Sequence, residues 1–373
     1  MYIPLLKPIL RTIGRLLSFA LYAATLIAAF GGRVSPEIST FPSVMVLTLP
    51  YLAIATLLVS VAWICTCRFF TGGLGLLTIF IAISPITTAC PISFSKNPDP
   101  DADTFTLMSY NMVNGTDQQH IGNQTGCRAL QYVLHSGADI VCLQEARQWK
   151  DPHMTNLTPA LRDSLFAAYP YHAFLNEELD TKVLSKYPMR PIPGDTYIHE
   201  KYDRMRYTFW EVDIKGHKVT LVNMHFRSPG LDSKEKTVVK EMASMKNTKS
   251  TMEEMKGSIY TKLGLSFKSR KHDAEILRRA LDEIEGDLIV CGDFNDVPES
   301  FAYRLLRGED LRDAYAETGF GPMITYNLHA FWFHLDQIFY RGDLKALSVK
   351  KGKIKASDHY PLTAEFEFTP EKK

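Results

Sequence analysis

The first 95 residues contain three long stretches without a charged side chain, which run from Leu16 to Gly32, from Ile38 to Cys67 and from Phe69 to Ser95. A helix that crosses a bilayer needs ~20 mostly apolar residues. These stretches also lack the polar face that a soluble helix turns to water. The sequence therefore predicts an N-terminal membrane anchor of about three transmembrane helices. We place them at Leu16–Gly31, Val44–Ile64 and Gly73–Ala89.

The basic residues around these stretches predict an orientation. Lys7, Arg11 and Arg15 precede the first stretch, and Arg68 lies between the second and the third. Because basic loops favour the cytoplasmic side, we expect a multi-pass membrane protein with a cytoplasmic N-terminus and with everything after Cys90 outside the cytoplasm. Basic residues before a short apolar run also fit a cleaved signal peptide. The two remaining spans would still anchor the chain.

A polar, proline-containing linker at residues 95–103 separates the anchor at residues 1–94 from a globular region at residues 104–370. That region is long enough to bury one sizeable core. Cys142 and Cys291 lie in apolar runs and are expected to pack as small hydrophobic residues. No spacing among the six cysteines predicts a zinc site or a disulfide framework.

The globular region alternates between strand-like and helix-like patterns. Short apolar or alternating runs bounded by turn residues predict strands, and apolar residues at helical spacing predict helices. We expect an α+β domain of two packed sheets flanked by helices. The predicted strands are 104–110, 140–144, 207–214, 218–225, 288–291, 335–340, 347–349 and 362–368, and the predicted helices are 128–134 and 272–284.

A lysine-rich segment, residues 227–271, interrupts this alternation. It contains eleven basic and five acidic residues, and Met242, Met245, Met252 and Met255 have helix-like spacing. The segment is either a solvated helical excursion or a basic lid that recruits an anionic substrate or lipid headgroups.

Six short stretches place polar side chains where a strand begins or ends. Singly, most are ordinary turn or edge residues, but their combination in one chain is not. Gly292-Asp293-Phe294-Asn295-Asp296 is the most informative, because it follows an apolar strand and places acids on both sides of an asparagine. The other five are Ser109-Tyr110-Asn111, Leu143-Gln144-Glu145, Val222-Asn223-Met224-His225, His334-Leu335-Asp336-Gln337-Ile338 and Ser357-Asp358-His359.

These side chains suit a divalent metal, a phosphate and an activated water. Mg²⁺ prefers hard oxygen ligands and keeps several waters, a role that Glu145 and Asn111 fit. Asp293 is a candidate base for a water that attacks phosphorus, and Asn295 can hold the same water or a phosphate oxygen. The pattern therefore predicts phosphoester hydrolysis, because charge that develops on phosphoryl oxygens is stabilised by a cation and fixed donors.

Three further residues complete this predicted site. His359 can polarise a phosphoryl oxygen or shuttle a proton, with Asp336 fixing its tautomer. His225 can bind phosphate or protonate the leaving group.

The order of these stretches resembles that of the endonuclease/exonuclease/phosphatase superfamily, over residues Thr104 to Phe368. That superfamily includes pancreatic-type deoxyribonuclease, abasic-site endonucleases, inositol-polyphosphate 5-phosphatases and bacterial sphingomyelinases. The resemblance implies a four-layered αββα sandwich and magnesium-dependent phosphoester hydrolysis, here in a membrane-anchored, bacterial-type member.

By motif position, the resemblance implies metal-site residues at Asn111 and Glu145, with Asp358 as a neighbouring acid on the metal side. It implies a water-orienting pair at Asp293 and Asn295, an Asp–His pair at Asp336 and His359, and a second histidine at His225. Thr181-Lys182-Val183-Leu184-Ser185 resembles another strand of the superfamily but lacks its glycine-containing start. We expect Lys182 to point at the substrate if that strand is not simply an edge.

The residues after position 100 include 36 basic and 39 acidic side chains. This balance is a poor surface for sequence-independent DNA binding, which depends on neutralising phosphates. We expect a membrane-anchored, Mg²⁺-dependent phosphodiesterase of nuclease type, with Mn²⁺ as an alternative metal. The open alternatives are a phospholipid or inositol-phosphate phosphoesterase similar to sphingomyelinase, and a non-catalytic binding module on the same scaffold. The predicted partners are the phosphoester substrate and the lipid bilayer, and no protein partner is predicted.

Overall fold

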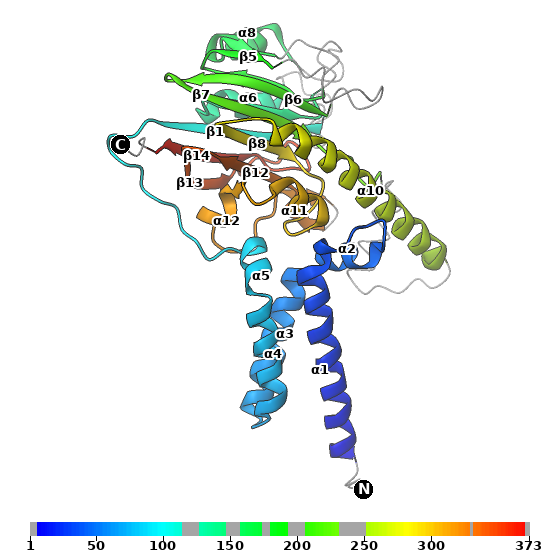
Figure 1. Ribbon diagram of the computed structural model, residues 1–373. Helices are drawn as coiled ribbons and strands as arrows, with labels where there is room; N and C mark the ends of the chain where they lie inside the picture. Colours follow the sequence, from blue (N-terminus) through cyan, green and yellow to red (C-terminus); the bar gives the residue numbers. More distant parts are fainter. Residues whose placement is uncertain are drawn as a thin grey trace.

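The computed structural model describes most of the chain as an N-terminal group of helices joined to an α+β sandwich (Figure 1). The described residues are 6–113, 127–146, 157–173, 180–192, 206–230, 251–328 and 331–369. α1, α3 and α4 project from one side of the sandwich, and the N-terminus lies at their far end (Figure 1).

The N-terminal group contains one long helix and two bent helix pairs. Residues Pro8–Arg33 are long and apolar enough to cross a membrane as one helix. Each pair passes the same test only if it is counted as one span, with a bend of 68° in the first pair and 62° in the second. The elements are α1 (Leu6–Phe30), η1 (Gly31–Arg33), α2 (Thr40–Val46), α3 (Leu49–Cys65), α4 (Phe69–Ile81) and α5 (Ile83–Ala89).

The prediction of three continuous spans is therefore wrong, and one continuous candidate replaces it in the described chain. The physical reason lies in two prolines. Pro50 stands in the first turn of α3 and Pro85 stands in α5, close to the two bends. Because proline lacks the N–H that continues a helical hydrogen-bond ladder, it favours a break just before its own turn.

The first sheet has six strands in the order β13-β14-β1-β2-β4-β3. β1 and β2 run parallel and the other neighbours run antiparallel, so this is a mixed sheet. Its strands are β1 (Thr104–Asn111), β2 (Ile140–Gln144), β3 (Tyr171–His172), β4 (Lys182–Ser185), β13 (Leu344–Lys351) and β14 (Leu362–Phe368).

The second sheet also has six strands, in the order β5-β6-β7-β8-β12-β9, and β7 and β8 are its parallel pair. A separate hairpin joins β10 (Tyr326–Leu328) to β11 (Phe331–Phe333). The strands of the sheet are β5 (Met189–Pro191), β6 (Tyr207–Ile214), β7 (His217–His225), β8 (Asp287–Asp293), β9 (Arg312–Asp313) and β12 (Asp336–Arg341).

Three buried clusters show how the layers pack. The first lies between the sheets and includes Leu107 of β1 and Ile289 of β8. The second covers the outer face of the first sheet with α6 (Arg128–Ser136) and α8 (Pro159–Ala168). The third covers the second sheet with α10 (Thr251–Asp282) and α11 (Phe301–Arg307). The expected α+β sandwich of two sheets flanked by helices is confirmed.

The two parallel pairs determine where the polar strand ends lie. Asn111 stands opposite Gln144 at the end of β1 and β2, and His225 stands opposite Asp293 at the end of β7 and β8. Asp336, at the start of antiparallel β12, also pairs with Asp293. Carboxyl ends of parallel strands meet at one edge of a sheet, so the fold gathers residues that are far apart in sequence.

The helices join the sandwich on one side of their bundle through η1 and α2. Gly32 packs so closely that a Cβ atom there would lie 1.9 Å from the carbonyl oxygen of Glu299, a distance no side chain can adopt. Thr40 of α2 contacts Gly264 of α10, and Lys271 pairs with Glu37 at 3.4 Å.

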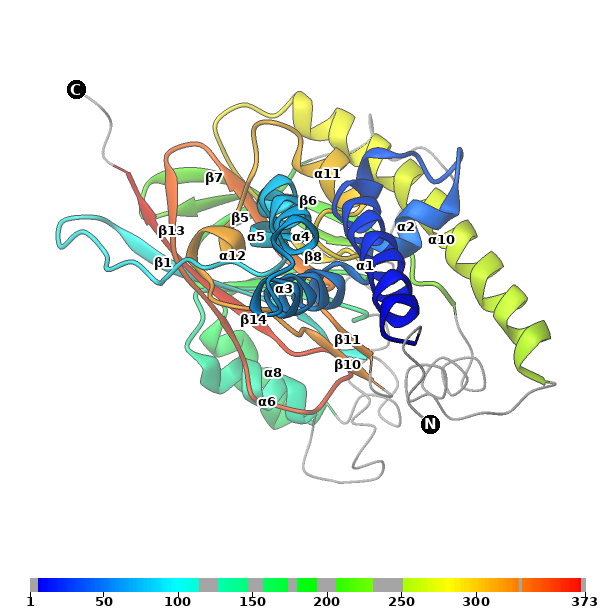
Figure 2. The same cartoon turned by 90° about the horizontal axis from the view of Figure 1, so that it is seen from below.

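On the other side of the bundle, the segment after α5 pairs with the loop that follows α12 (Ala314–Thr318). Ile92 forms an isolated bridge with Phe320, and Ser93 N–H donates to the Gly319 carbonyl at 2.9 Å. Figure 2 shows α2 and α12 on opposite sides of α1, α3 and α4. We call the surface formed by η1, α2, residues 91–96, α12 and residues 319–321 the anchor face.

Candidate active site

Asp293, the last residue of β8, is the centre of a buried polar cluster. Its Oδ2 accepts hydrogen bonds from the side-chain amides of Asn111 at 2.9 Å and Asn295 at 3.2 Å. Its Oδ1 accepts a third from the Asn295 backbone N–H at 2.7 Å. Asn111 belongs to the first sheet and Asp293 to the second, so this carboxylate connects the ends of the two sheets. The structure therefore brings these three predicted residues together.

The local backbone explains why a glycine precedes Asp293. Gly292 has φ +147°, and a Cβ atom there would lie 1.8 Å from the Met224 carbonyl oxygen of β7. Only glycine permits that approach. Asn295 adopts a left-handed φ of +49°, a region that asparagine tolerates better than most residues. The turn is thereby sharp enough to return the Asn295 amide to the carboxylate of Asp293.

His359 and Asp336 form the predicted Asp–His pair beside Asp293. His359 Nδ1 lies 2.8 Å from Asp336 Oδ2, and Nε2 lies 3.5 Å from Asp293 Oδ2. Burial opposes protonation of the His359 imidazole, but the carboxylates of Asp336 and Asp293 outweigh burial and raise its pKa to about 10. Burial raises the pKa of Asp293 to about 6, although the His359 imidazole partly offsets it. At neutral pH the cationic imidazole of His359 therefore lies next to the ionised carboxylate of Asp293.

His225 stands on the other side of Asp293. Its Nδ1 contacts Asp180 Oδ2 at 2.5 Å, and its Nε2 lies 3.7 Å from Glu145 Oε1 and 3.8 Å from Asp293 Oδ2. Burial lowers the pKa of His225, but hydrogen bonding to Asp180 and the charges of Asp293 and Glu145 raise it overall. Asp180 was missed by sequence reasoning, because a single acid ahead of an unremarkable strand gives no signal without its spatial partner.

Carboxylates converge around this cluster in a way that fits a divalent cation. Asn111 donates to Glu145 Oε1 at 3.1 Å, and the Glu145 side chain is 30% exposed. Burial and the charges of Asp358, Asp293 and Glu145 raise the pKa of the Tyr326 hydroxyl. Hard oxygen donors such as these carboxylates suit Mg²⁺ or Mn²⁺.

A second group of possible ligands overlaps the first. Asp293, Asp336 and His359 place one ligand atom each within 4.8 Å of one another. In this group, however, Asp336 and His359 already bond to each other. As metal ligands, Glu145, Asn111 and Asp358 stay a prediction.

A buried amide network lies beneath the cluster, between the sheets. Gln144 donates to Asn223 Oδ1 at 2.7 Å and to Ser109 Oγ at 3.2 Å. Asn223 donates to the backbone carbonyls of Leu143 at 3.1 Å and Lys182 at 2.9 Å. Because the Gln144–Asn223 bond and the Asn223 bonds to Leu143 and Lys182 join strands of the two sheets, the network stabilises the strand ends that carry the polar cluster.

Lys182 lies in β4 opposite Leu143, and none of its surface is exposed. β4 stands between β2 and β3, so it is not an edge strand. That the Lys182 side chain points at a substrate stays a prediction.

The lysine-rich segment contributes a buried ion pair next to the turn at residues 293–296, which we call the catalytic turn. Residues 251–271 form the first part of α10, and residues 231–250, with Met242 and Met245, lie outside the described residues. Arg270 is 1% exposed and donates to Asp296 Oδ2 at 3.1 Å and to the Arg227 carbonyl at 3.2 Å. This ion pair ties α10 to the turn that contains Asn295.

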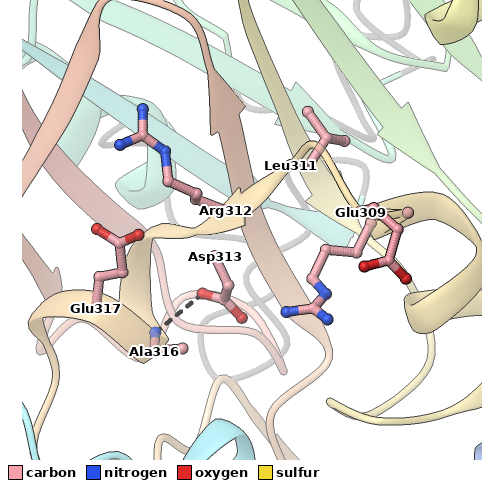
Figure 3. Close-up of a pocket in the computed structure, with 8 residues that line it drawn as sticks. Glu309, Leu311, Arg312, Asp313, Ala316 and Glu317 are labelled. Atoms are coloured by element: carbon pink, nitrogen blue, oxygen red, sulfur yellow. Dashed lines mark hydrogen bonds between the residues drawn. The ribbon is translucent and has the colours of Figure 1, made fainter.

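A pocket of about 390 Å³ lies elsewhere, between α11 and α12, and contains none of the predicted site residues (Figure 3). Three of its charged side chains, Arg312, Asp313 and Glu317, have structural partners. Asp313 accepts hydrogen bonds from the Tyr303 hydroxyl and from the Ala316 N–H at the start of α12. We assign the chemistry to the polar cluster and not to this pocket.

The sequence profile of the endonuclease/exonuclease/phosphatase family matches residues 108–359. The chain belongs to this family. The match contains every residue of the polar cluster, from Asn111 to His359, and it confirms the membership that the motifs predicted. The membrane anchor and the bacterial type lie beyond what the match covers.

Among solved structures, the chain is similar to truncated Caenorhabditis elegans TDP2, with 18% identity over 71% of this chain and 97% of that chain and a TM-score of 0.44. It is also similar to an endonuclease/exonuclease/phosphatase protein from Bacteroides vulgatus, with 17% identity, 71% and 99% coverage and a TM-score of 0.45. A third similar structure is D. rerio TDP2 complexed with a single-strand DNA product, with 16% identity over 71% of this chain and 99% of that chain and a TM-score of 0.46. No curated protein matches the chain.

Proposed function

We propose that this chain is a membrane-anchored, metal-dependent phosphoesterase that cleaves phosphodiesters. The observation that carries the proposal is the buried Asp293 carboxylate, held by Asn111 and Asn295 between the imidazoles of His225 and His359. Family membership supports it, because the family description covers endonucleases, exonucleases and phosphatases. In this proposal residues 1–94 are the anchor, 95–103 the linker and 104–370 the catalytic domain.

The polar cluster supplies a base, a cation and fixed donors. Asp293, with a pKa of about 6, is ionised at neutral pH and can accept a proton from an attacking water. Asn295 orients that water or a phosphoryl oxygen. His359 is cationic and faces the same carboxylate, so its Nε2 is placed to stabilise charge on the phosphoryl group. His225, held by Asp180, can give a proton to the leaving oxygen.

Glu145, Asn111 and Asp358 would hold the metal, which we propose to be Mg²⁺ with Mn²⁺ as the alternative. When bound, such a cation neutralises phosphate charge and polarises a phosphoryl oxygen. The charges of Asp358, Asp293 and Glu145 all act on the Tyr326 hydroxyl, and this clustering of acids supports the assignment.

The substrate remains a choice between two phosphodiester classes. Nucleic acid is the first, and the acidic balance of the residues after position 100 weighs against it. Phospholipid or inositol phosphate is the second, and the apolar N-terminal helix supports it. We also propose, from the basic residues before the candidate span, that the catalytic domain lies outside the cytoplasm.

Hydrolysis by the full-length protein in detergent tests the activity. We expect release of nitrophenol from bis-(p-nitrophenyl) phosphate with Mg²⁺ or Mn²⁺ and none with EDTA. Asp293→Asn should lower the rate by about 10²–10⁴-fold, the usual contribution of a general base. Asp163→Asn, an exposed acid on α8, is the matched control and should leave the rate unchanged. Turnover that persists in Asp293→Asn would refute the mechanism, and silence of the wild type on all phosphodiesters would favour a binding module.

A further inference from the structure

The anchor face, together with the turn at residues 34–39 that joins η1 to α2, carries large apolar side chains that no other part of the described chain covers. Five of them are well exposed: Ile38 at 81%, Phe41 at 51%, Ile92 at 70%, Phe94 at 70% and Phe320 at 67%. A water-facing surface rarely groups such residues unless it binds something.

Three of these side chains form one ordered cluster directly after α5. The rings of Phe94 and Phe320 stack with their centroids 5.3 Å apart and an angle of 21° between planes. The Ile92–Phe320 bridge fixes the backbones of the same residues. The cluster is therefore a built feature of the folded chain, and its exposure follows from the backbone pairing.

The apolar residues lie on both sides of the helices. Ile38 and Phe41 belong to the turn before α2 and its first residues, whereas Ile92, Phe94 and Phe320 lie beside α12. α2 and α12 flank α1, α3 and α4 on opposite sides (Figure 2). A partner that contacts both sides must surround the helices, which a sheet-like partner does and a compact protein docking on one side does not.

The apolar surface is also continuous with the helices themselves. Phe80, Ile81 and Ile83, at the end of α4 and the start of α5, are 72%, 49% and 46% exposed. A lipid bilayer is the partner that covers apolar helices and an apolar ring around their base at once, since phenylalanine and isoleucine side chains bury readily at the headgroup boundary.

We propose that the anchor face rests on a lipid bilayer, with Ile38, Phe94 and Phe320 inserted at the level of the headgroups. This inference rests on the membrane anchoring in the proposed function. It has a consequence for the active site. Gly32, at the end of the candidate span Pro8–Arg33, touches Glu299, six residues after Asp293. The catalytic turn is therefore fixed close to the membrane surface, where the accessible phosphodiesters are those of lipid headgroups.

Fluorescence of labelled full-length protein in nanodiscs tests the proposal. The three cysteines with exposed surface, Cys65, Cys67 and Cys90, are first replaced by serine. An environment-sensitive nitrobenzoxadiazole label is then placed at Phe320→Cys or Ile38→Cys. Ser164→Cys is the control, because it lies exposed on α8, on the outer face of the first sheet, which Figure 1 shows on the side away from the helices. The nanodiscs contain phosphatidylcholine with or without a nitroxide-bearing lipid.

We expect blue-shifted emission at positions 320 and 38 and several-fold stronger nitroxide quenching there than at position 164. Equal quenching at all three positions would overturn the proposal, as would quenching on one side of the helices only. Crosslinking between copies through position 320 would instead assign the face to a second copy of the chain. Hydrolysis of bis-(p-nitrophenyl) phosphate is measured on the same samples, so a failure of the bilayer contact and a failure of the phosphoesterase assignment give different results.

Discussion

The buried ion pair between Arg270 and Asp296 makes a strong prediction about stability. Both side chains are almost completely buried, and Arg270 also binds the Arg227 carbonyl. Replacing Arg270 by methionine keeps most of the side-chain volume but leaves the Asp296 carboxylate buried without its cation. Removing one partner of a buried pair typically destabilises a protein by about 3–5 kcal/mol. We expect the lower part of that range, because burial already raises the pKa of Asp296 and protonation offers partial relief.

Urea unfolding of the full-length protein in detergent, followed by tryptophan fluorescence, measures this effect. With a slope of about 2–3 kcal/mol per M, a loss of 3 kcal/mol lowers the midpoint by about 1–1.5 M. Lys268→Met is the control, since this exposed lysine lies on the same helix and its loss should change stability by less than about 0.5 kcal/mol.

A double-mutant cycle separates the ion pair from the packing of the arginine. Arg270→Met combined with Asp296→Leu removes the unpaired charge and should recover part of the lost stability. If Arg270→Met is no more destabilising than Lys268→Met, then the Arg270–Asp296 ion pair does not stabilise the fold and the reasoning is refuted.

Three further outcomes follow from the site and its surroundings. Asp336→Asn should lower the pKa of His359 and reduce turnover. Its effect and that of His359→Gln should not add, which the double variant checks by kcat. Glu145→Gln should raise the Mg²⁺ concentration needed for half-maximal activity by 10-fold or more, on the order of the effect of losing a ligand-supporting group, and an unchanged metal titration would remove Glu145 from the metal site. Burial lowers the pKa of His334 to about 4. The unfolded chain therefore takes up a proton below its usual pKa of about 6.5 that the folded chain does not, so stability falls by up to about 3 kcal/mol between pH 6.5 and 4. His334→Phe should remove that part of the pH dependence in urea unfolding, and equal slopes would contradict it.

Sequence reasoning located the sandwich well where the chain gives short-range signals. β2 and β14 have the predicted bounds, and the hairpin of β6 and β7 turns at Lys215 and Gly216 as expected. Apolar periodicity and turn residues are properties of neighbours in sequence, which explains this success. The predicted helix at 272–284 is only the last part of α10, which begins at Thr251, inside the segment that was predicted as either a helical excursion or a lid.

The site could be predicted in its composition and in the Asp336–His359 pair, but not in its other pairings. The motifs named Asp293, Asn295 and His359, because each stands within three residues of a strand end. They could not reveal Asp180 as the partner of His225, or Arg270 as the partner of Asp296, since these contacts join residues 45 and 26 positions apart. Such pairs depend on the crossing of strands and helices, which periodicity does not encode.

The helical part also escaped sequence reasoning in one respect. Hydropathy identified the apolar stretches, but the predicted spans Val44–Ile64 and Gly73–Ala89 run across Pro50 and Pro85. In the structure the helices bend near both residues. Hydropathy is averaged over a window of residues, so it does not register the loss of a single backbone N–H at a proline.

Gly32 is a position at which one added methyl group would separate the N-terminal helix from the sandwich. A single methyl group there would press against the carbonyl of Glu299 and force the helix end away from the loop that follows the catalytic turn, while every side chain of the polar cluster stays chemically intact. A substitution at Gly32 can thus disturb the contact between the helix and the sandwich without changing a side chain of the polar cluster. The alanine variant at this position is accordingly a tool for asking whether an enzyme of this design needs to be held at a surface in order to work there.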